Sequence, residues 1–226
     1  MAGIVLISRV TKATTFIGLR PIWFATSCNF HLLRKRCPAR MEADWEFEIG
    51  GDAPVIEAHW RGFVDLRADP NRARDLAEAK HLPGLANTLM GLNTRNSPVW
   101  TCKTDVFVPG QIDPDELEAR GEEATHAIAC YVDLLMRSDQ QWNSLFEAER
   151  SCKKLCARLR DMPLRRCRID LVVRGAQIKS DVNDLGMTAY LTACGLTESD
   201  AKSRLAACLS LFSEAILSAS GSRMQP

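Results

Sequence analysis

The sequence predicts an α+β fold: a mixed or antiparallel sheet with its helices packed mainly on one face. Segments of strictly alternating apolar and polar residues predict the strands, and segments with helical spacing of apolar residues separate them. A short internal repeat joins the two kinds of segment, since FVDL (63–66) and YVDL (131–134) each lead into a helical stretch and then a second strand, KTDV (103–106) or RIDL (168–171). Two such halves in one sheet predict a ferredoxin-like βαββαβ core with an extra N-terminal strand and a C-terminal βα pair.

The alternation predicts six strands, in the order β, β, α, β, β, α, β, β, α with the helices. Their expected ranges are 44–50, 55–67, 99–108, 127–137, 167–175 and 187–194. In the third strand the count places Trp100, Cys102, Val106 and Val108 on the inward face. The acidic, turn-rich stretch 109–123 is expected to be a surface loop, with a single helical turn after Asp113-Pro114.

Capping residues predict where the helices begin. Asp69 followed by Pro70 predicts a helix to about residue 80, with a second piece ending near residue 92. Ser144 and Glu147 have capping-box spacing before a long helix. Thr197 precedes a closing helix with an apolar stripe formed by Leu205, Cys208, Leu209, Phe212 and Ile216.

Charge divides the chain into an arm and a body. Residues 1–40 hold seven basic residues and no Asp or Glu, whereas residues 41–226 hold 22 Lys and Arg against 28 Asp and Glu. Three interpretations of the arm remain open: a transit-like or disordered targeting segment, an upstream extension from a mis-assigned start codon, and a segment that binds nucleic acid or membrane. We therefore expect a basic extension over 1–40, a single α+β domain over 41–218 and a frayed tail over 219–226.

Composition and cysteine placement limit the class of protein. With 46% hydrophobic and 25% charged residues the chain is typical of a globular protein, and no apolar run is long enough to span a membrane. The nine cysteines are odd in number and lie mostly in strand-like or helix-like apolar runs, which favours free, buried thiols and a reducing, cytoplasmic location. The acidic body disfavours nucleic acid as a partner, because phosphates require a basic surface.

Four aspartates are the main candidate site. Asp65, Asp105, Asp133 and Asp170 occupy equivalent positions in four predicted strands, all on the polar face, and basic residues that include Arg61 and Arg168 flank them. One interpretation is a solvated face of cross-strand ion pairs. The other is a carboxylate cluster that holds Mg²⁺ or Ca²⁺, or a charged platform for a polar ligand.

The other candidate catalytic or metal-binding residues do not form a complete site in the sequence. His59 lies on the same polar face and is a candidate general base next to Asp65 or Asp133, and Asp133 is itself a candidate catalytic residue. Cys194, before the closing helix, is a candidate reactive thiol whose pKa the helix N-terminus would lower. Cys152 and Cys156 have the spacing of two zinc ligands, but no second Cys or His pair completes a site. The sequence contains no GxSxG, P-loop, GxGxxG or HExxH motif.

The sequence therefore predicts a non-catalytic interaction or binding protein that uses its open sheet face or an edge strand. Its partner would be a protein or a small polar ligand, and no cofactor or metal is expected. The alternative is an enzyme of unknown class that uses the Asp/Arg/His cluster, with or without a divalent cation. Nothing in the sequence indicates the oligomeric state.

Overall fold

The fold is known from a computed structural model, which describes residues 40–48, 55–56, 64–137, 141–178 and 182–221. Six strands and seven helical segments follow one another along these residues. The strands are β1 (Glu42–Glu48), β2 (Val55–Ile56), β3 (Val99–Phe107), β4 (His126–Met136), β5 (Cys167–Ile178) and β6 (Val182–Gly195). The α-helices are α1 (Ala77–His81), α2 (Leu85–Leu92), α3 (Leu145–Arg160) and α4 (Glu198–Gly221), and the 3₁₀ segments are η1 (Pro70–Asp75), η2 (Asp115–Leu117) and η3 (Gly121–Ala124).

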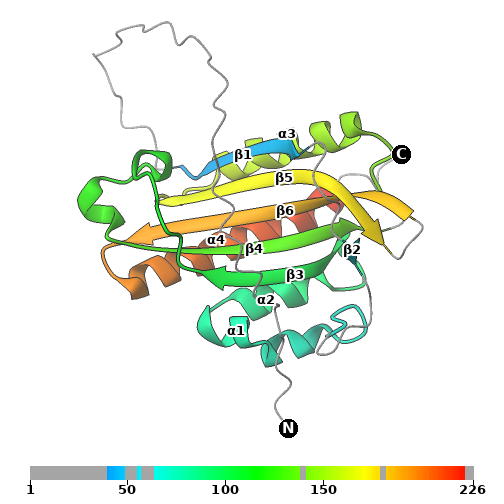
Figure 1. Cartoon of the computed structure of the whole chain (residues 1–226), viewed down its shortest axis with the longest axis horizontal. Helices are drawn as coiled ribbons and strands as arrows, with labels where there is room; N and C mark the ends of the chain where they lie inside the picture. The colour runs from blue at the N-terminus through cyan, green and yellow to red at the C-terminus, as the bar shows by residue number, and fades with distance from the viewer. Residues whose placement is uncertain (1–39, 49–54, 57–63, 138–140, 179–181, 222–226) are drawn as a thin grey trace, which may run out of the picture.

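The strands form one mixed sheet in the order β1-β5-β6-β4-β3 (Figure 1), with β2 also paired to β5. The β1–β5 and β2–β5 pairs are parallel, whereas β5–β6, β6–β4 and β4–β3 are antiparallel. The chain leaves β4 through α3 and re-enters the sheet at β5, and β6 lies between these two parallel strands. The α+β class predicted from the sequence is confirmed.

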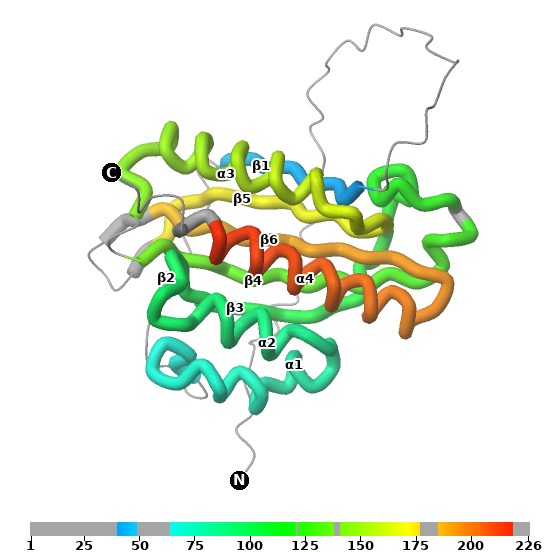
Figure 2. Tube along the Cα trace, turned by 180° about the vertical axis from the view of Figure 1, so that it is seen from behind, coloured from blue at the N-terminus to red at the C-terminus, as the bar shows by residue number. Residues whose placement is uncertain are grey.

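The helices form a single layer on one face of the sheet (Figure 2). Helix α4 packs on β6, β4 and β5, α3 packs on β1, and α2 packs on α4 and β3. The buried inward-facing strand residues pack with these helices in the main apolar cluster, so the core lies between sheet and helices. The predicted stripe of α4 is confirmed, because all its members are buried: Leu205, Cys208, Leu209, Phe212 and Ile216.

The ferredoxin-like arrangement is not confirmed, because the observed strand order is mixed. That prediction required residues 55–67 to form one long strand, and of the described residues in this range only Val55 and Ile56 are in a strand. Residues 57–63 lie outside the described part of the chain, and residues 64–69 form a turn that leads into η1. Residues 187–194, expected as the strand of an added C-terminal βα pair, instead belong to β6, which lies in the interior of the sheet.

A bulge in β3 corrects the predicted faces of that strand. The register with β4 shifts between Thr101 and Thr104. An extra residue in one strand reverses which face the preceding side chains occupy. Trp100 and Cys102, expected to point inward, therefore pack with Leu135 and Ala176 in a separate cluster on the opposite face.

The predicted helix starts agree with the structure. Asp69 accepts a hydrogen bond from the Asn71 backbone N–H, although the helix that follows is the 3₁₀ segment η1. Ser144 caps α3 by accepting from the Glu147 N–H at 3.2 Å. Helix α4 runs to Gly221, so residues 219–221, expected to fray, are helical.

Candidate functional site

The sheet face opposite the helix layer, here called the outer face, carries the candidate site. It displays every second residue of each strand, and strand pairing aligns these residues in rows. The central row crosses five strands, and its members are Asp44 of β1, Asp170 of β5, Tyr190 of β6, Tyr131 of β4 and Asp105 of β3. Two neighbouring tyrosines thus stand between flanking aspartates.

Tyr131 and Tyr190 form an aromatic pair at the centre of this row. Their ring centroids are 6.1 Å apart and their planes are inclined at 50°. Both side chains are half-buried. Burial, with Asp133 and Asp105 nearby, raises the pKa of Tyr131 to about 12, so its hydroxyl stays protonated at neutral pH. The pair can therefore present ring surface and hydroxyl donors to a bound molecule.

The predicted aspartates do not gather at one point. Asp170 accepts two hydrogen bonds from Arg168 Nε, at 2.9 and 2.8 Å, two positions earlier in the same strand. Asp105 accepts at 2.7 Å from the backbone N–H of Val106. Within the described ranges no three His, Cys, Asp or Glu side chains lie close enough to hold a metal ion.

Asp65 lies off the sheet, in the turn before η1. Its carboxylate accepts from Arg67 Nε at 2.9 Å and Nη2 at 3.0 Å, and these hydrogen bonds lower its pKa. The guanidinium carbon of Arg67 stands 4.4 Å from the ring centroid of Trp100. At the β3 edge of the outer face, a guanidinium thus stands over an aromatic ring and is held by a carboxylate.

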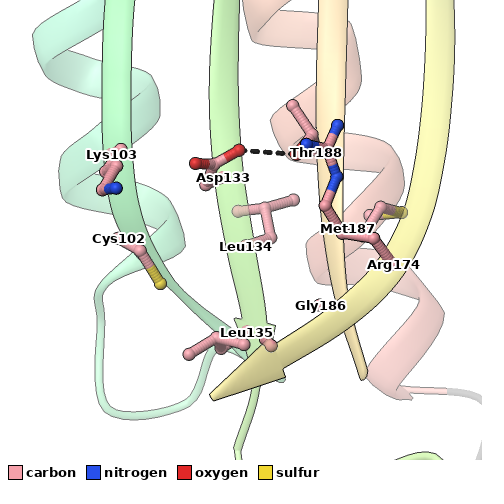
Figure 3. Close-up of a pocket in the computed structure, with 10 residues that line it drawn as sticks. Cys102, Lys103, Asp133, Leu134, Leu135, Arg174, Gly186, Met187 and Thr188 are labelled. Atoms are coloured by element: carbon pink, nitrogen blue, oxygen red, sulfur yellow. Dashed lines mark hydrogen bonds between the residues drawn. The ribbon is translucent and has the colours of Figure 1, made fainter. Parts of the chain in front are cut away.

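Asp133 borders a small pocket on the outer face (Figure 3). Its Oδ1 accepts a 2.6 Å hydrogen bond from Thr188 on the neighbouring strand β6. Burial raises the pKa of Asp133, and the Thr188 hydrogen bond and the cations of Arg174 and Lys103 oppose this shift. The remaining lining is largely apolar, and it comprises Cys102, Leu134, Leu135, Ala176, Gly186 and Met187.

Gly186 forms part of this pocket because it carries no side chain. A Cβ at this position would lie 3.2 Å from the Ala176 Cβ and 3.3 Å from Leu135 Cδ2. Arg174 stands at the pocket and also reaches the tyrosines, because its Nη2 donates to the Tyr190 hydroxyl at 3.4 Å. Its Nε is 3.3 Å from Glu48 Oε2, an ion pair whose angle does not give a hydrogen bond.

Carboxylates outnumber cations on the outer face. By the strand register, seven acids and three basic residues project from it among the described side chains. The basic residues are Lys103, Arg168 and Arg174. All four outer-face residues of β1 are acidic, and they are Glu42, Asp44, Glu46 and Glu48. Sequence alternation indicated a charged face but not this concentration of acids on one edge strand.

Two described residues, Cys194 and Arg137, do not join the outer-face site. His59 and Arg61 lie outside the described residues. Cys194 is fully buried beneath Leu117 and Ala119, and burial raises its pKa rather than lowering it. Arg137 donates to the backbone carbonyls of Ser97, Asn93 and Thr94, so it serves the end of α2.

The helix cysteines lie in the core. Cys152 and Cys156 are each 1% exposed and pack in the main apolar cluster. Burial raises the pKa of Cys152 to about 12 and that of Cys156 to about 11, so both remain thiols at neutral pH. The seven described cysteines are free, and none of them is exposed.

A second charged cluster lies at the far end of the sheet, where η3, β5 and α4 meet. Arg166 pairs with Glu123 and lies 3.8 Å from Asp200, which also pairs with Arg204 at 2.9 Å. Arg166 adopts the left-handed φ of 62°. These pairs hold the 109–125 segment against the ends of β5 and β6, which is a structural role.

Comparison with known proteins gives no functional lead. No protein-family model, no curated protein and no solved structure matches the chain. Across the described residues, no helix combines the length and the apolar character needed to cross a membrane.

Proposed function

We propose that this protein is a non-catalytic binding protein whose outer sheet face recognises a partner. The observation that carries the proposal is the half-buried Tyr131–Tyr190 pair, set at the centre of the face and flanked by carboxylates. Among the described elements, all four α-helices lie on the other side of the sheet (Figures 1 and 2). Tyrosines of this kind are preferred in binding surfaces because they bury a large area at low entropic cost.

The positions of the aspartates favour binding over catalysis. An enzyme that uses a cluster of acid, base and cation needs these groups within reach of one reacting centre. Here Asp105, Asp133 and Asp170 each engage a different partner in a different strand. The alternative, an enzyme that uses an Asp/Arg/His cluster with a divalent cation, gains no support from the described residues.

The binding partner is a protein or a small polar ligand. A protein would cover the tyrosine row, whereas a small ligand would enter the pocket beside Asp133. The row is the larger feature, since it spans five strands, and it favours a protein partner. We also propose a cytoplasmic location, which free and buried thiols support.

A peptide array probed with the full chain tests this function. We expect the wild-type chain to bind a subset of peptides, and the double variant Tyr131→Ala/Tyr190→Ala to lose about tenfold or more in affinity. The matched control is Leu145→Ala/Phe146→Ala, which removes two large exposed side chains from α3 in the helix layer. Circular dichroism verifies that both variants are folded.

Two outcomes would contradict the proposal. The first is binding that the tyrosine variant retains in full. The second is binding that only the α3 variant loses, which would assign recognition to the helix layer.

A further inference from the structure

We propose that the partner presents a basic, extended segment, whose arginine side chains stack on Tyr131 and Tyr190 and pair with the carboxylates around them. This inference rests on the proposed function and names the chemistry of its partner. Three features of the outer face carry it: its charge, its blocked strand edges and the stacked arginine that it already contains.

The charge of the outer face is not balanced internally. Asp170 is neutralised by Arg168, and Glu48 faces Arg174 across the β1–β5 pair. Asp44 lies 3.7 Å from Arg160 Nη2 of α3, and Arg67 is held by Asp65. The remaining carboxylates are Glu42, Glu46, Asp105 and Asp133, against the cation Lys103 among the described residues of this face. A surface of one sign attracts a partner of the other sign and repels a second copy of itself.

The strand edges direct the partner across the face rather than onto an edge. In β1 the N–H of Trp45 donates to the Asp44 carboxylate at 2.8 Å, and the carbonyl of Ala43 accepts from Arg160 Nε at 2.7 Å. In β3 the N–H of Val106 donates to Asp105. Because these backbone groups are already satisfied, an added strand would have to displace them. Recognition therefore uses the side chains of the face.

The outer face already holds an arginine in the arrangement that we propose for the partner. Arg67 stacks over Trp100 while Asp65 binds its guanidinium through two hydrogen bonds. At the tyrosine pair, Asp105 stands beside Tyr131, and the Tyr190 hydroxyl accepts from Arg174, so the pair offers ring faces and a carboxylate to a further guanidinium. Guanidinium groups suit this geometry better than ammonium groups, since they are planar and can stack and pair at once.

The size of the row sets the length of the segment. Five strands at the usual spacing extend over about 19 Å, which an extended peptide of about six residues covers. Arginines at alternate positions of such a peptide point to the same side. An alternating arginine–serine peptide is therefore the probe of choice.

Fluorescence anisotropy with the full chain tests the inference. Three labelled peptides of about eight residues are compared, in which serine alternates with arginine, lysine or glutamate. We expect the arginine peptide to bind about tenfold more tightly than the glutamate peptide and a few-fold more tightly than the lysine peptide. Affinity should fall as ionic strength rises.

Two pairs of charge variants locate the binding site. Glu42→Gln/Glu46→Gln removes two acids from the outer face and should weaken arginine-peptide binding about threefold or more. Asp75→Asn/Glu78→Gln makes the same change in net charge near α1, in the helix layer, and should leave binding unchanged. Equal effects of the two pairs would overturn the inference, since the peptide would then respond to net charge alone.

The remaining outcomes separate this inference from the proposed function. Tyrosine-dependent binding of neutral or acidic peptides overturns the basic partner and leaves the binding function intact. Loss of tyrosine-dependent binding to every peptide overturns both. Self-association through the tyrosine face would show that a second copy of the chain is the occupant. Tighter peptide binding after Arg34→Gln/Lys35→Gln/Arg36→Gln would show that the chain's own arm is the occupant. Either result overturns the inference.

Discussion

At the scale of single residues, the burial of Asp133 should affect how the free energy of unfolding depends on pH. Its carboxylate is half-buried beside the pocket, and burial raises its pKa. A carboxyl group whose pKa is raised in the folded state favours folding most below its unfolded value of about 3.9. That contribution is lost as the pH rises through the folded pKa. At neutral pH the ionised Asp133 therefore carries a cost in unfolding free energy.

Replacing Asp133 tests this cost. Asp133→Asn keeps an oxygen that can accept from Thr188 and removes the charge, so we expect a stabilisation of up to about 1 kcal/mol near neutral pH. The gain should be smaller at an acidic pH than at neutral pH, because the raised pKa makes wild-type Asp133 take up its proton as the pH falls. Urea unfolding at both pH values measures the difference.

A clear destabilisation by Asp133→Asn at neutral pH would contradict the burial argument. The same variant bears on the enzymatic alternative. If Mg²⁺, Mn²⁺ or Ca²⁺ raises the melting temperature of the wild type and Asp133→Asn abolishes that shift, a cation site exists and the binding function needs revision.

At the scale of elements, the edge strands β1 and β3 share a protective device. Asp44 and Asp105 lie at opposite ends of the central row, and each accepts a hydrogen bond from the N–H of the residue that follows it. The free N–H groups of edge strands otherwise provide a template for pairing with another chain. The two aspartates thus accept hydrogen bonds from edge-strand N–H groups. This role explains Asp105 without a metal ion.

Removal of the hydrogen bond between Asp44 and the edge-strand backbone should increase self-association. Asp44→Ala frees the Trp45 N–H and removes a charge, so we expect more oligomer at high protein concentration than for the wild type. Glu46→Ala is the matched control, because Glu46 lies on the same face of β1 and forms no side-chain hydrogen bond or ion pair among the described residues. Sedimentation velocity measures the oligomer fraction. Equal oligomer fractions for the two variants would assign the effect to charge alone.

Local chemistry explains which elements the sequence could predict. Helix starts depend on a few neighbouring residues, so Asp69, Ser144 and Thr197 identified them correctly. Strand order depends on pairings between distant segments, which alternation does not encode. The repeat around FVDL and YVDL therefore suggested a ferredoxin-like order that the structure does not confirm, and the bulge in β3 reversed the faces of Trp100 and Cys102.

The candidate site was predictable to a similar degree. Alternation placed Asp105, Asp133 and Asp170 on the outer face, as the strand register shows. Their individual partners were not predictable, since the Asp133–Thr188 hydrogen bond and the Tyr131–Tyr190 pair require the neighbouring positions of β4 and β6. Asp65 was assigned to a strand because its neighbours alternate, but it lies in a turn.

At the scale of the whole molecule, the division between arm and domain is testable by deletion. The core begins at Met41, which is 1% exposed and whose sulfur is 3.6 Å from Cys208 Sγ. Removal of residues 1–40 should therefore change the melting temperature by less than about 2 °C. Thermal unfolding followed by circular dichroism measures this change. Insolubility or a loss of several degrees would show that the arm contributes to the folded domain.

The parallel pairing of β1 with β5 determines when the sheet can be completed during synthesis. Glu42 and its partner Arg168 are 126 positions apart in the chain. At a synthesis rate of about 5–20 residues per second, β1 waits about 6–25 s for its only described neighbour in the sheet. Trp45 and Phe47, which pack together beneath α3 in the finished fold, are unpaired throughout that delay. The nascent chain should therefore be most susceptible to chaperone capture and proteolysis at β1.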